Sequence, residues 1–183
     1  MRRILLAVAG LFLPLLCGSY TAYESAKQKF ELIESESLRA GSRVALTPRE
    51  LNAYVEQEAP DGVRNPKLDL GSGSATGSAL VDFLKLRRAQ GQQPGWLMSK
   101  LLEGERPVRV VARVTSGNGR AQVDVQSVEI SGISIEGRML DYLIRNYLHS
   151  YYPGAKVGEP FELGHRIDRL EIKPSSVGVV IGR

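Results

Sequence analysis

The chain has 183 residues, of which 43% are hydrophobic and 24% are charged, so it is long enough to bury one globular core and is not a disordered chain. The net charge of +4 includes Arg2 and Arg3 at the very start, and later arginines such as Arg109 and Arg113 are interleaved with valines, so no basic stripe predicts nucleic-acid binding. Cys17 is the single cysteine, which excludes an intrachain disulfide and a zinc site built from several thiolates.

Residues 1–23 have the pattern of an export signal or a membrane anchor. Two arginines precede an apolar run that starts at Ile4, and no charge follows until Glu24. The 20 residues from Ile4 to Tyr23 are just long enough to span a bilayer as a helix, whereas cleavage after Ser19 and lipidation of Cys17 are open alternatives. In each case we expect the rest of the chain to work outside the cytoplasm, either anchored to the outer face of the cytoplasmic membrane or in the periplasm.

Residues 24–43 predict a helical stalk that leads from the membrane to the folded domain. Phe30, Ile33 and Leu38 stand among closely spaced charges, and Gly41 ends the pattern. We therefore expect a single domain over residues 44–183.

The stretch "LTPRELNAYV" predicts a helix with a complete N-terminal signal. Thr47 is placed to be the N-cap, Pro48 the first helical residue and Glu50 the partner in a capping box, while Leu46 and Leu51 can form a hydrophobic staple. The pair Ala59-Pro60 predicts the end of this helix.

Strands follow. "VRNPKLDL" and "TGSALVDFLKL" predict two strands joined by a "GSGSA" turn, and this glycine-rich turn is not a phosphate loop because a strand pattern, not a helix, comes after it. "GWLMSKLLEGERP" then predicts a short helix, whose Trp96, Leu97 and Leu101 should be buried or in contact with something apolar.

Residues 108–125 predict a β-hairpin with the turn "SGNG". Beyond it the apolar positions change parity twice, which predicts one β-bulge near Gln126-Ser127 and another at Ser131-Gly132. A further change of parity occurs between Ile167 and Leu170. Repeated kinks of this kind predict a curved antiparallel sheet that wraps around a helix or closes on a cavity.

Residues 139–152 predict that helix. Its apolar face, which includes Met139, Leu143, Ile144 and Tyr147, covers an arc of roughly 180°, wider than one flat contact needs. His149 falls on the opposite, solvated face, which argues against a catalytic base.

Catalytic signals are few. The chain contains no "GxSxG" elbow and no closely spaced metal ligands, and the strand carboxylates such as Asp124 and Glu129 are expected to face water. His165 shares its parity with Phe161 and Leu163 on an inward face, where a satisfied structural histidine is the ordinary interpretation. We therefore expect no enzyme, no cofactor and no metal.

The "LTPRELN" opening at Leu46 to Asn52, followed by long strands and an apolar helix after the fourth strand, resembles small bacterial envelope proteins related to the tubular lipid-binding (TULIP, SMP-like) superfamily. The resemblance covers residues 44–183. It implies a curved antiparallel sheet around a helix, with a lipid or other hydrophobic ligand held in an apolar groove between them, and it transfers no binding residue.

The leading hypothesis is thus an α+β, non-enzymatic envelope protein that binds a lipid or another hydrophobic ligand. A membrane-anchored scaffold that binds an envelope protein through an apolar patch at residues 96–102 is the alternative, and an envelope hydrolase is the third. The ordinary alternative for each lining residue is a dry core. The expected lining residues are Trp96, Leu97, Leu101, Val123, Val125, Ile130, Ile133, Met139, Leu143, Ile144 and Tyr147.

Overall fold

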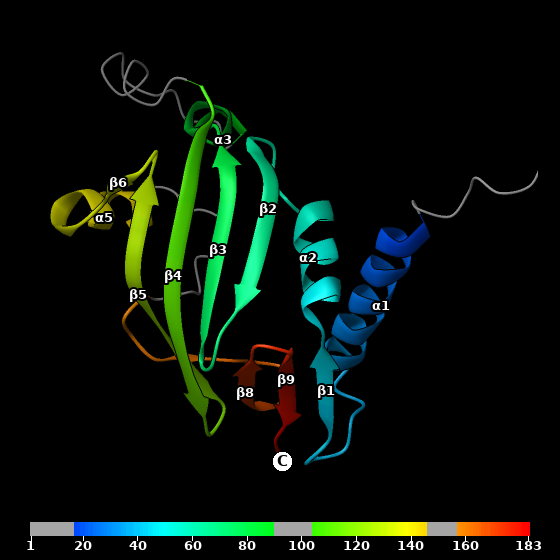
Figure 1. The fold of residues 1–183 in the computed structure, drawn as a ribbon. Coiled ribbons are helices and arrows are strands. Elements are labelled where there is room, and N and C mark those ends of the chain that lie inside the picture. The colour runs from blue at the N-terminus through cyan, green and yellow to red at the C-terminus, as the bar shows by residue number, and fades with distance from the viewer. Residues whose placement is uncertain (1–16, 90–103, 146–156) are drawn as a thin grey trace, which may run out of the picture.

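The computed structural model describes residues 17–89, 104–145 and 157–183. Among them, two antiparallel sheets are formed, one in the order β1-β9-β8 and one in the order β2-β3-β4-β5-β6, with β7 paired to β5 (Figure 1). The elements are α1 (Cys17–Glu34), β1 (Arg43–Leu46), α2 (Pro48–Gln57), β2 (Val63–Leu70), β3 (Ser74–Val81), α3 (Phe83–Ala89), β4 (Arg106–Gly117), β5 (Arg120–Ile130), β6 (Ile133–Ser134), α5 (Gly137–Leu143), β7 (Phe161–Glu162), β8 (Ile167–Lys173) and β9 (Ser176–Ile181). The expected α+β class with a curved antiparallel sheet is confirmed.

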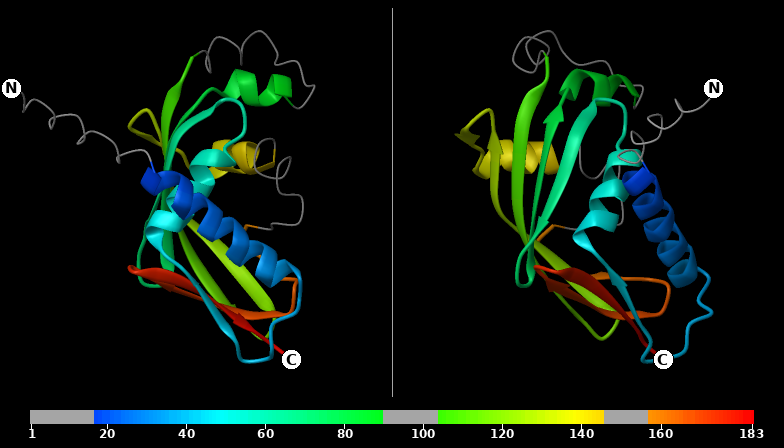
Figure 2. Two further views of the ribbon diagram at one scale, coloured as in Figure 1. Left: turned by 90° about the vertical axis from the view of Figure 1, so that its right-hand side faces the viewer. Right: turned by 45° about the vertical axis from the view of Figure 1, so that its right-hand side comes forward.

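The larger sheet carries α3 and α5 on the same face, which we call the inner face (Figure 2). Ala79 pairs with Val108, and Val108 pairs with Ile130, so these three side chains project to that face. Together with residues of both helices they form the α3/α5 cluster. Its members are Val63, Ala79, Val81, Phe83, Leu86, Val108, Ile130, Tyr142 and Leu143.

The bulge predicted near Gln126-Ser127 is confirmed. Val111 pairs with Ser127 and Ala112 pairs with Val125, so Gln126 is the extra residue. The bulge restores the apolar parity, because Val125 and Val128 then project to the same face.

The second predicted bulge, at Ser131-Gly132, is wrong. Ile130 and Ile133 are register partners, and Ser131 and Gly132 between them both have positive φ values, 52° and 80°. This is a two-residue hairpin turn, in which two left-handed residues match the twist of the flanking strands. The apolar parity changes there because the chain reverses direction.

The strand expected over "TGSALVDFLKL" stops at Val81, and α3 begins at Phe83. Asp82 causes the change, since its Oδ1 accepts hydrogen bonds from the backbone N–H groups of Leu84 (3.1 Å) and Lys85 (3.0 Å). An aspartate that takes up the first free N–H groups of a helix is a strong start signal. The apolar residues on both sides of Asp82 made the segment resemble a continuing strand.

The free-standing stalk expected over residues 24–43 is not confirmed. The helix α1 ends at Glu34 and packs against α2, and Ala26 and Ile33 on it are buried at 0% and 5% exposure. This part of the chain therefore contributes to a second core, the α1/α2 cluster. Its buried members are Ala26, Ile33, Val44, Leu46, Val179 and Ile181.

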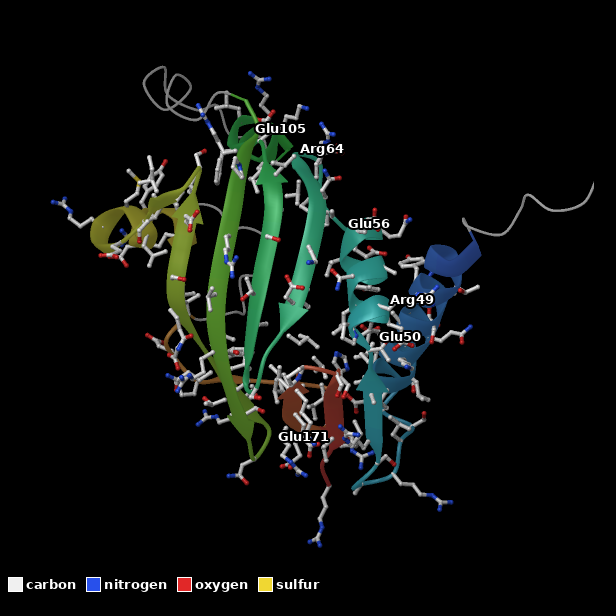
Figure 3. All side chains as sticks on the ribbon, in the orientation of Figure 1. Arg49, Glu50, Glu56, Arg64, Glu105 and Glu171 are labelled. Carbon is white, nitrogen blue, oxygen red and sulfur yellow. The ribbon has the colours of Figure 1, made fainter. Side chains whose placement is uncertain are left out.

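The predicted helix start at Thr47 is confirmed, with a complete capping box and Pro48 as the first helical residue. Figure 3 shows Glu50 on α2, where it meets α1. Its Oε1 accepts hydrogen bonds from Lys29 Nζ and Ser25 Oγ, both at 2.6 Å, and its Oε2 accepts one from the backbone N–H of Thr47 at 2.8 Å. Burial alone would raise the pKa of Glu50, but these hydrogen bonds outweigh it and lower the pKa from 4.5 to about 2.

Asn52, on the same helix, closes the free edge of β2. Its Nδ2 donates to the carbonyl of Leu68 and its Oδ1 accepts from the N–H of Leu68, both at 2.8 Å. A side-chain amide thus replaces the neighbouring strand that an edge otherwise leaves open to pairing with another chain.

The turns at one end of the larger sheet cover the outer edge of β8 and so join the two sheets. The bonds run from Gly73 N to Ile172 O (3.0 Å), from Ser116 Oγ to Leu170 O (3.0 Å) and from Gly119 N to Asp168 O (2.9 Å). A bulge at Asp168 shifts the register between Ile167 and Arg169, as the change of parity there predicted.

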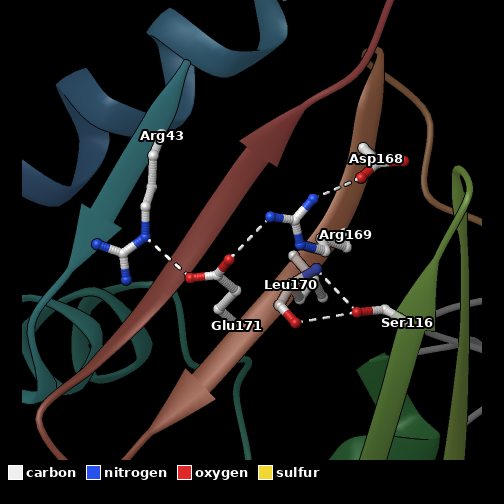
Figure 4. Close-up of polar contacts among 6 residues, drawn as sticks. All are labelled: Arg43, Ser116, Asp168, Arg169, Leu170 and Glu171. Carbon is white, nitrogen blue, oxygen red and sulfur yellow. Dashed lines mark hydrogen bonds and ion pairs between the residues drawn. The ribbon is translucent and has the colours of Figure 1, made fainter. Parts of the chain in front are cut away.

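Arg43 on β1 reaches across the central strand β9 to Glu171 on β8, with Nε donating to Oε2 at 3.1 Å (Figure 4). Gly178 lies beneath it, and a Cβ at this position would stand 2.7 Å from Arg43 Nε. The missing side chain therefore lets the guanidinium pass over β9. Glu171 also accepts a hydrogen bond from Arg169 at 3.1 Å.

Candidate ligand groove

A hollow of about 380 Å³ lies between α5 and the outer edge of β5. Its walls combine the apolar side chains of one strand, one helix and the segment before β7 with a few charged groups. The lining residues are Asp124, Val125, Leu140, Asp141, Ile144, Arg145, Val157 and Gly158.

The groove lies where the outer edge of β5 is not paired with another described strand. On one side, Gly158 N donates to Val123 O at 2.9 Å, and on the other, Ile135 N donates to Val128 O at 2.8 Å. Between these two points lie residues 124–127, which include the bulge at Gln126. The bulge interrupts the ladder and so helps to keep this part of the edge open.

The inner face of the sheet continues from the groove as an apolar surface that is only half-buried. Alternation places on it the side chains between the α3/α5 cluster and the turns that meet β8. These residues, each of intermediate exposure, are Leu68, Leu70, Ala75, Gly77, Val110, Ala112, Val123 and Val125.

Gly77 marks the open centre of this surface. It pairs with Val110 on one side and Leu68 on the other, and a Cβ built on it would meet no atom of the described residues within 4 Å. A glycine within a strand often marks a place where another group approaches the backbone closely.

The groove also has polar residues in its lining. Asp124 accepts a hydrogen bond from Gln122 Nε2 at 2.9 Å. Asp141 and Arg145, one turn apart on the helix, are both exposed. A lining that combines apolar and charged side chains suits a ligand that has an apolar chain and a polar head.

Two of the predicted lining residues, Val125 and Ile144, do line the groove. Val123 flanks it through its carbonyl, which is bonded to Gly158. Ile130 and Leu143 instead pack in the α3/α5 cluster, where the ordinary alternative, a dry core, holds. Trp96, Leu97, Leu101 and Tyr147 lie outside the described residues.

Ile133 and Met139 are not among the residues that line this groove. Ile133 is 66% exposed because it follows the hairpin turn in a two-residue edge strand. Met139 is 51% exposed because it lies one helical turn before Leu143, where α5 first meets the sheet. The helical wheel placed it correctly beside Leu143 but did not reveal where along the axis the contact begins.

The helix expected over 139–152 is described as α-helix from Gly137 to Leu143, and residues 146–152 lie outside the described residues. Tyr142 packs in the α3/α5 cluster, although helical spacing from Met139 places it on the same polar face as His149. Leu140 lines the groove, and helical spacing places it on the apolar arc beside Ile144, so the sequence carried a signal for it. Val157 and Gly158 carried none, because their place depends on an isolated bridge between Val157 and Val123.

The inward position expected for His165 is wrong. Gly164, His165 and Arg166 all have positive φ values, so they form a turn and not a strand, and the His165 side chain is 50% exposed. Its Nδ1 lies 3.7 Å from Glu36 Oε1. In the described part of the chain, no group of three potential metal ligands occurs.

No protein-family model, no curated protein and no solved structure was found to match this chain. Within residues 17–89, 104–145 and 157–183, no helix has the length and apolar character needed to cross a membrane. The apolar run that begins at Ile4 lies largely outside these ranges.

Proposed function

We propose that the protein binds a lipid or another amphiphilic ligand, with the apolar chain on the inner face and the polar head at the charged residues of the groove. The half-buried inner face around Gly77 carries this proposal, because a folded domain gains stability by covering apolar surface and this surface is left partly open. The groove volume of about 380 Å³ falls within the range of small-molecule sites.

Each methylene group that moves from water onto this face would contribute about 0.8 kcal/mol. Association costs about 4 kcal/mol or more in lost freedom, so a chain needs more than about five methylenes on this face before the burial gives net binding. Arg145 in the lining can pair with an anionic head.

We further propose that residues 1–23 export the chain or anchor it at the outer face of the cytoplasmic membrane. The ligand would then be a lipid or another apolar component of the cell envelope.

Filling the inner face tests the function. Gly77→Phe places a ring in the open space without a backbone penalty, because Gly77 does not have a positive φ. Thr76→Phe is the matched control, since Thr76 is the next residue of β3 and projects to the opposite face. The probe is a dansyl-labelled fatty acid, titrated into the full chain after lipid removal.

We expect the unmodified chain and Thr76→Phe to bind the probe within twofold of each other, and Gly77→Phe to bind at least tenfold more weakly. Equal binding by both variants, or no binding by the unmodified chain, would reject the proposal.

A second candidate, the scaffold, is favoured by the exposure of Ile133 and Met139 near the β6–α5 corner. Large exposed apolar side chains are typical of contact surfaces. This function predicts that Ile133→Ser with Met139→Ser abolishes crosslinking to an envelope protein in intact cells and leaves fatty-acid binding unchanged.

A further inference from the structure

A second hollow, of about 570 Å³, lies at the end of the molecule away from the C-terminus. Residues 59–62, the loop between α2 and β2, form one wall. Val63 and Arg64 of β2 and Lys85 and Arg88 of α3 form the other. We call this hollow the cationic pocket.

The lining contains three bases and one acid, Asp61, and two of the bases have an acidic neighbour outside the lining. Arg64 is paired with Glu105 at 2.9 Å, and Figure 3 shows both at this end. Lys85 and Arg88, three residues apart on α3, share a helix face. For Arg88 the described residues provide no carboxylate within ion-pair distance, and it is exposed.

Asp82 does not neutralise Lys85 fully. Its Oδ2 lies 3.8 Å from Lys85 Nζ, beyond hydrogen-bond distance. Its Oδ1 is used to cap α3. The ammonium of Lys85, whose side chain is 60% exposed, therefore has donors available for a ligand.

The two walls of the cationic pocket are held together tightly. Gly62 has a φ of +99°, and a Cβ on it would stand 3.0 Å from both Asp82 O and Lys85 Cβ. The N–H of Asp82 donates to Gly62 O at 2.7 Å. The loop and α3 therefore hold the backbone positions from which the cations extend close together.

The pocket also lies close to the point where the chain leaves residues 1–23. Tyr23 Oη donates a 2.7 Å hydrogen bond to Glu58 Oε1, which raises the pKa of Tyr23 to about 12. Ala59 and Pro60 follow Glu58 directly and line the pocket. The beginning of the domain and the cationic pocket are thus joined through one hydrogen bond.

We propose that the cationic pocket binds the phosphate group of an anionic phospholipid in the leaflet that residues 1–23 enter. Guanidinium and ammonium groups are the usual partners of phosphate, and cations close to a membrane surface are attracted to anionic lipids. The inference depends on the proposed membrane location and not on ligand binding in the groove. The role of the cationic pocket would be to fix the orientation of the domain on the membrane.

The test uses the full chain, freed of lipid in a neutral detergent and titrated by native mass spectrometry with phosphatidylglycerol, phosphatidylcholine and inorganic phosphate. The test variant is Lys85→Gln with Arg88→Gln. The control is Arg120→Gln with Lys173→Gln, which also removes two exposed cations but at the β4–β5 turn and the end of β8.

We expect phosphatidylglycerol to bind more tightly than phosphatidylcholine, and the test variant to lose about tenfold or more in affinity for it. The control should stay within twofold. An equal loss in the control, equal binding of the two lipids, or inorganic phosphate binding as tightly as phosphatidylglycerol would overturn the proposal.

Dansyl fatty-acid binding by the test variant separates the two sites. It should equal that of the unmodified chain, which also shows that the variant is folded. If the unmodified chain binds no fatty acid, the groove proposal fails and the result for the cationic pocket still stands, with circular dichroism as the measure of folding.

Discussion

Replacing Glu50 should reduce stability in a way that depends on pH. Glu50 joins α1 to α2 through Lys29 and Ser25, and its side chain is only 10% exposed. Its pKa is about 2 in the folded chain against 4.5 for the free group. The folded state therefore binds this proton less readily than the unfolded state does.

The direction in which stability changes with pH follows from this difference in pKa. A carboxyl group with a lowered pKa contributes its full stability above about pH 4.5 and loses it as the pH falls through about 2. Each unit of pKa difference is worth about 1.4 kcal/mol, which gives an upper figure of about 3 kcal/mol. Because the Lys29 side chain is 30% exposed, solvent screening reduces the expected contribution to about 2 kcal/mol.

The assay is urea unfolding of the full chain and of Glu50→Gln at several pH values from 7 to 2. We expect Glu50→Gln to be less stable by about 2 kcal/mol at pH 7, and the difference to shrink as the pH falls below 4.5. Glu56→Gln is the control, because Glu56 lies on the same helix but is exposed (Figure 3). It should change stability by less than about 0.5 kcal/mol.

Two outcomes would refute the reasoning. If the stability of Glu50→Gln stays parallel to that of the unmodified chain from pH 7 to 2, the ion pair does not cause the pH dependence. If Glu56→Gln loses as much stability as Glu50→Gln, the loss reflects the charge of α2 and not the contact with α1.

Two further predictions concern the edges and the small sheet. Asn52→Ala leaves the backbone N–H and C=O of Leu68 without the Asn52 side chain as partner, so the free energy of unfolding in urea should fall by about 2 kcal/mol. The amide of Leu68 should also exchange faster, and unchanged exchange there would contradict the role of Asn52 in covering the edge of β2. Gly178→Ala should displace the Arg43 side chain and lose its pairing with Glu171, at a cost of about 1 kcal/mol or less because the pair is exposed. In a background that already carries Arg43→Ala, the same change should cost nothing, and a cost that persists there would show that Gly178 is needed for another reason.

Local features of the fold could be predicted from the sequence. The start of α2 at Thr47 and the bulge near Gln126 were both correct, because each depends on residues within a few positions of each other. The start of α3 at Asp82 had its own local signal but was missed, since apolar residues continue on both sides of it. The hairpin at Ser131-Gly132 was missed because a turn and a bulge change the parity of a strand in the same way.

The groove could be predicted only in part, because its walls meet through contacts distant in sequence. Val125 and Ile144 were correctly placed on apolar faces, but Val157 joins them through its bridge to Val123. A helical wheel and a strand alternation give directions around an axis. They do not give the point along the axis where two elements touch, which is why the exposure of Met139 could not be predicted.

The resemblance rested on the "LTPRELN" motif, and three residues of this motif have structural roles. Thr47 caps α2, Glu50 holds α1, and Asn52 closes the edge of β2. A motif of this kind specifies how a helix is attached to a curved sheet, and it says nothing about what the sheet binds. The proposed function must therefore rest on residues that the motif does not contain, above all Gly77, where no atom of the described residues lies within 4 Å of the position that a Cβ would take.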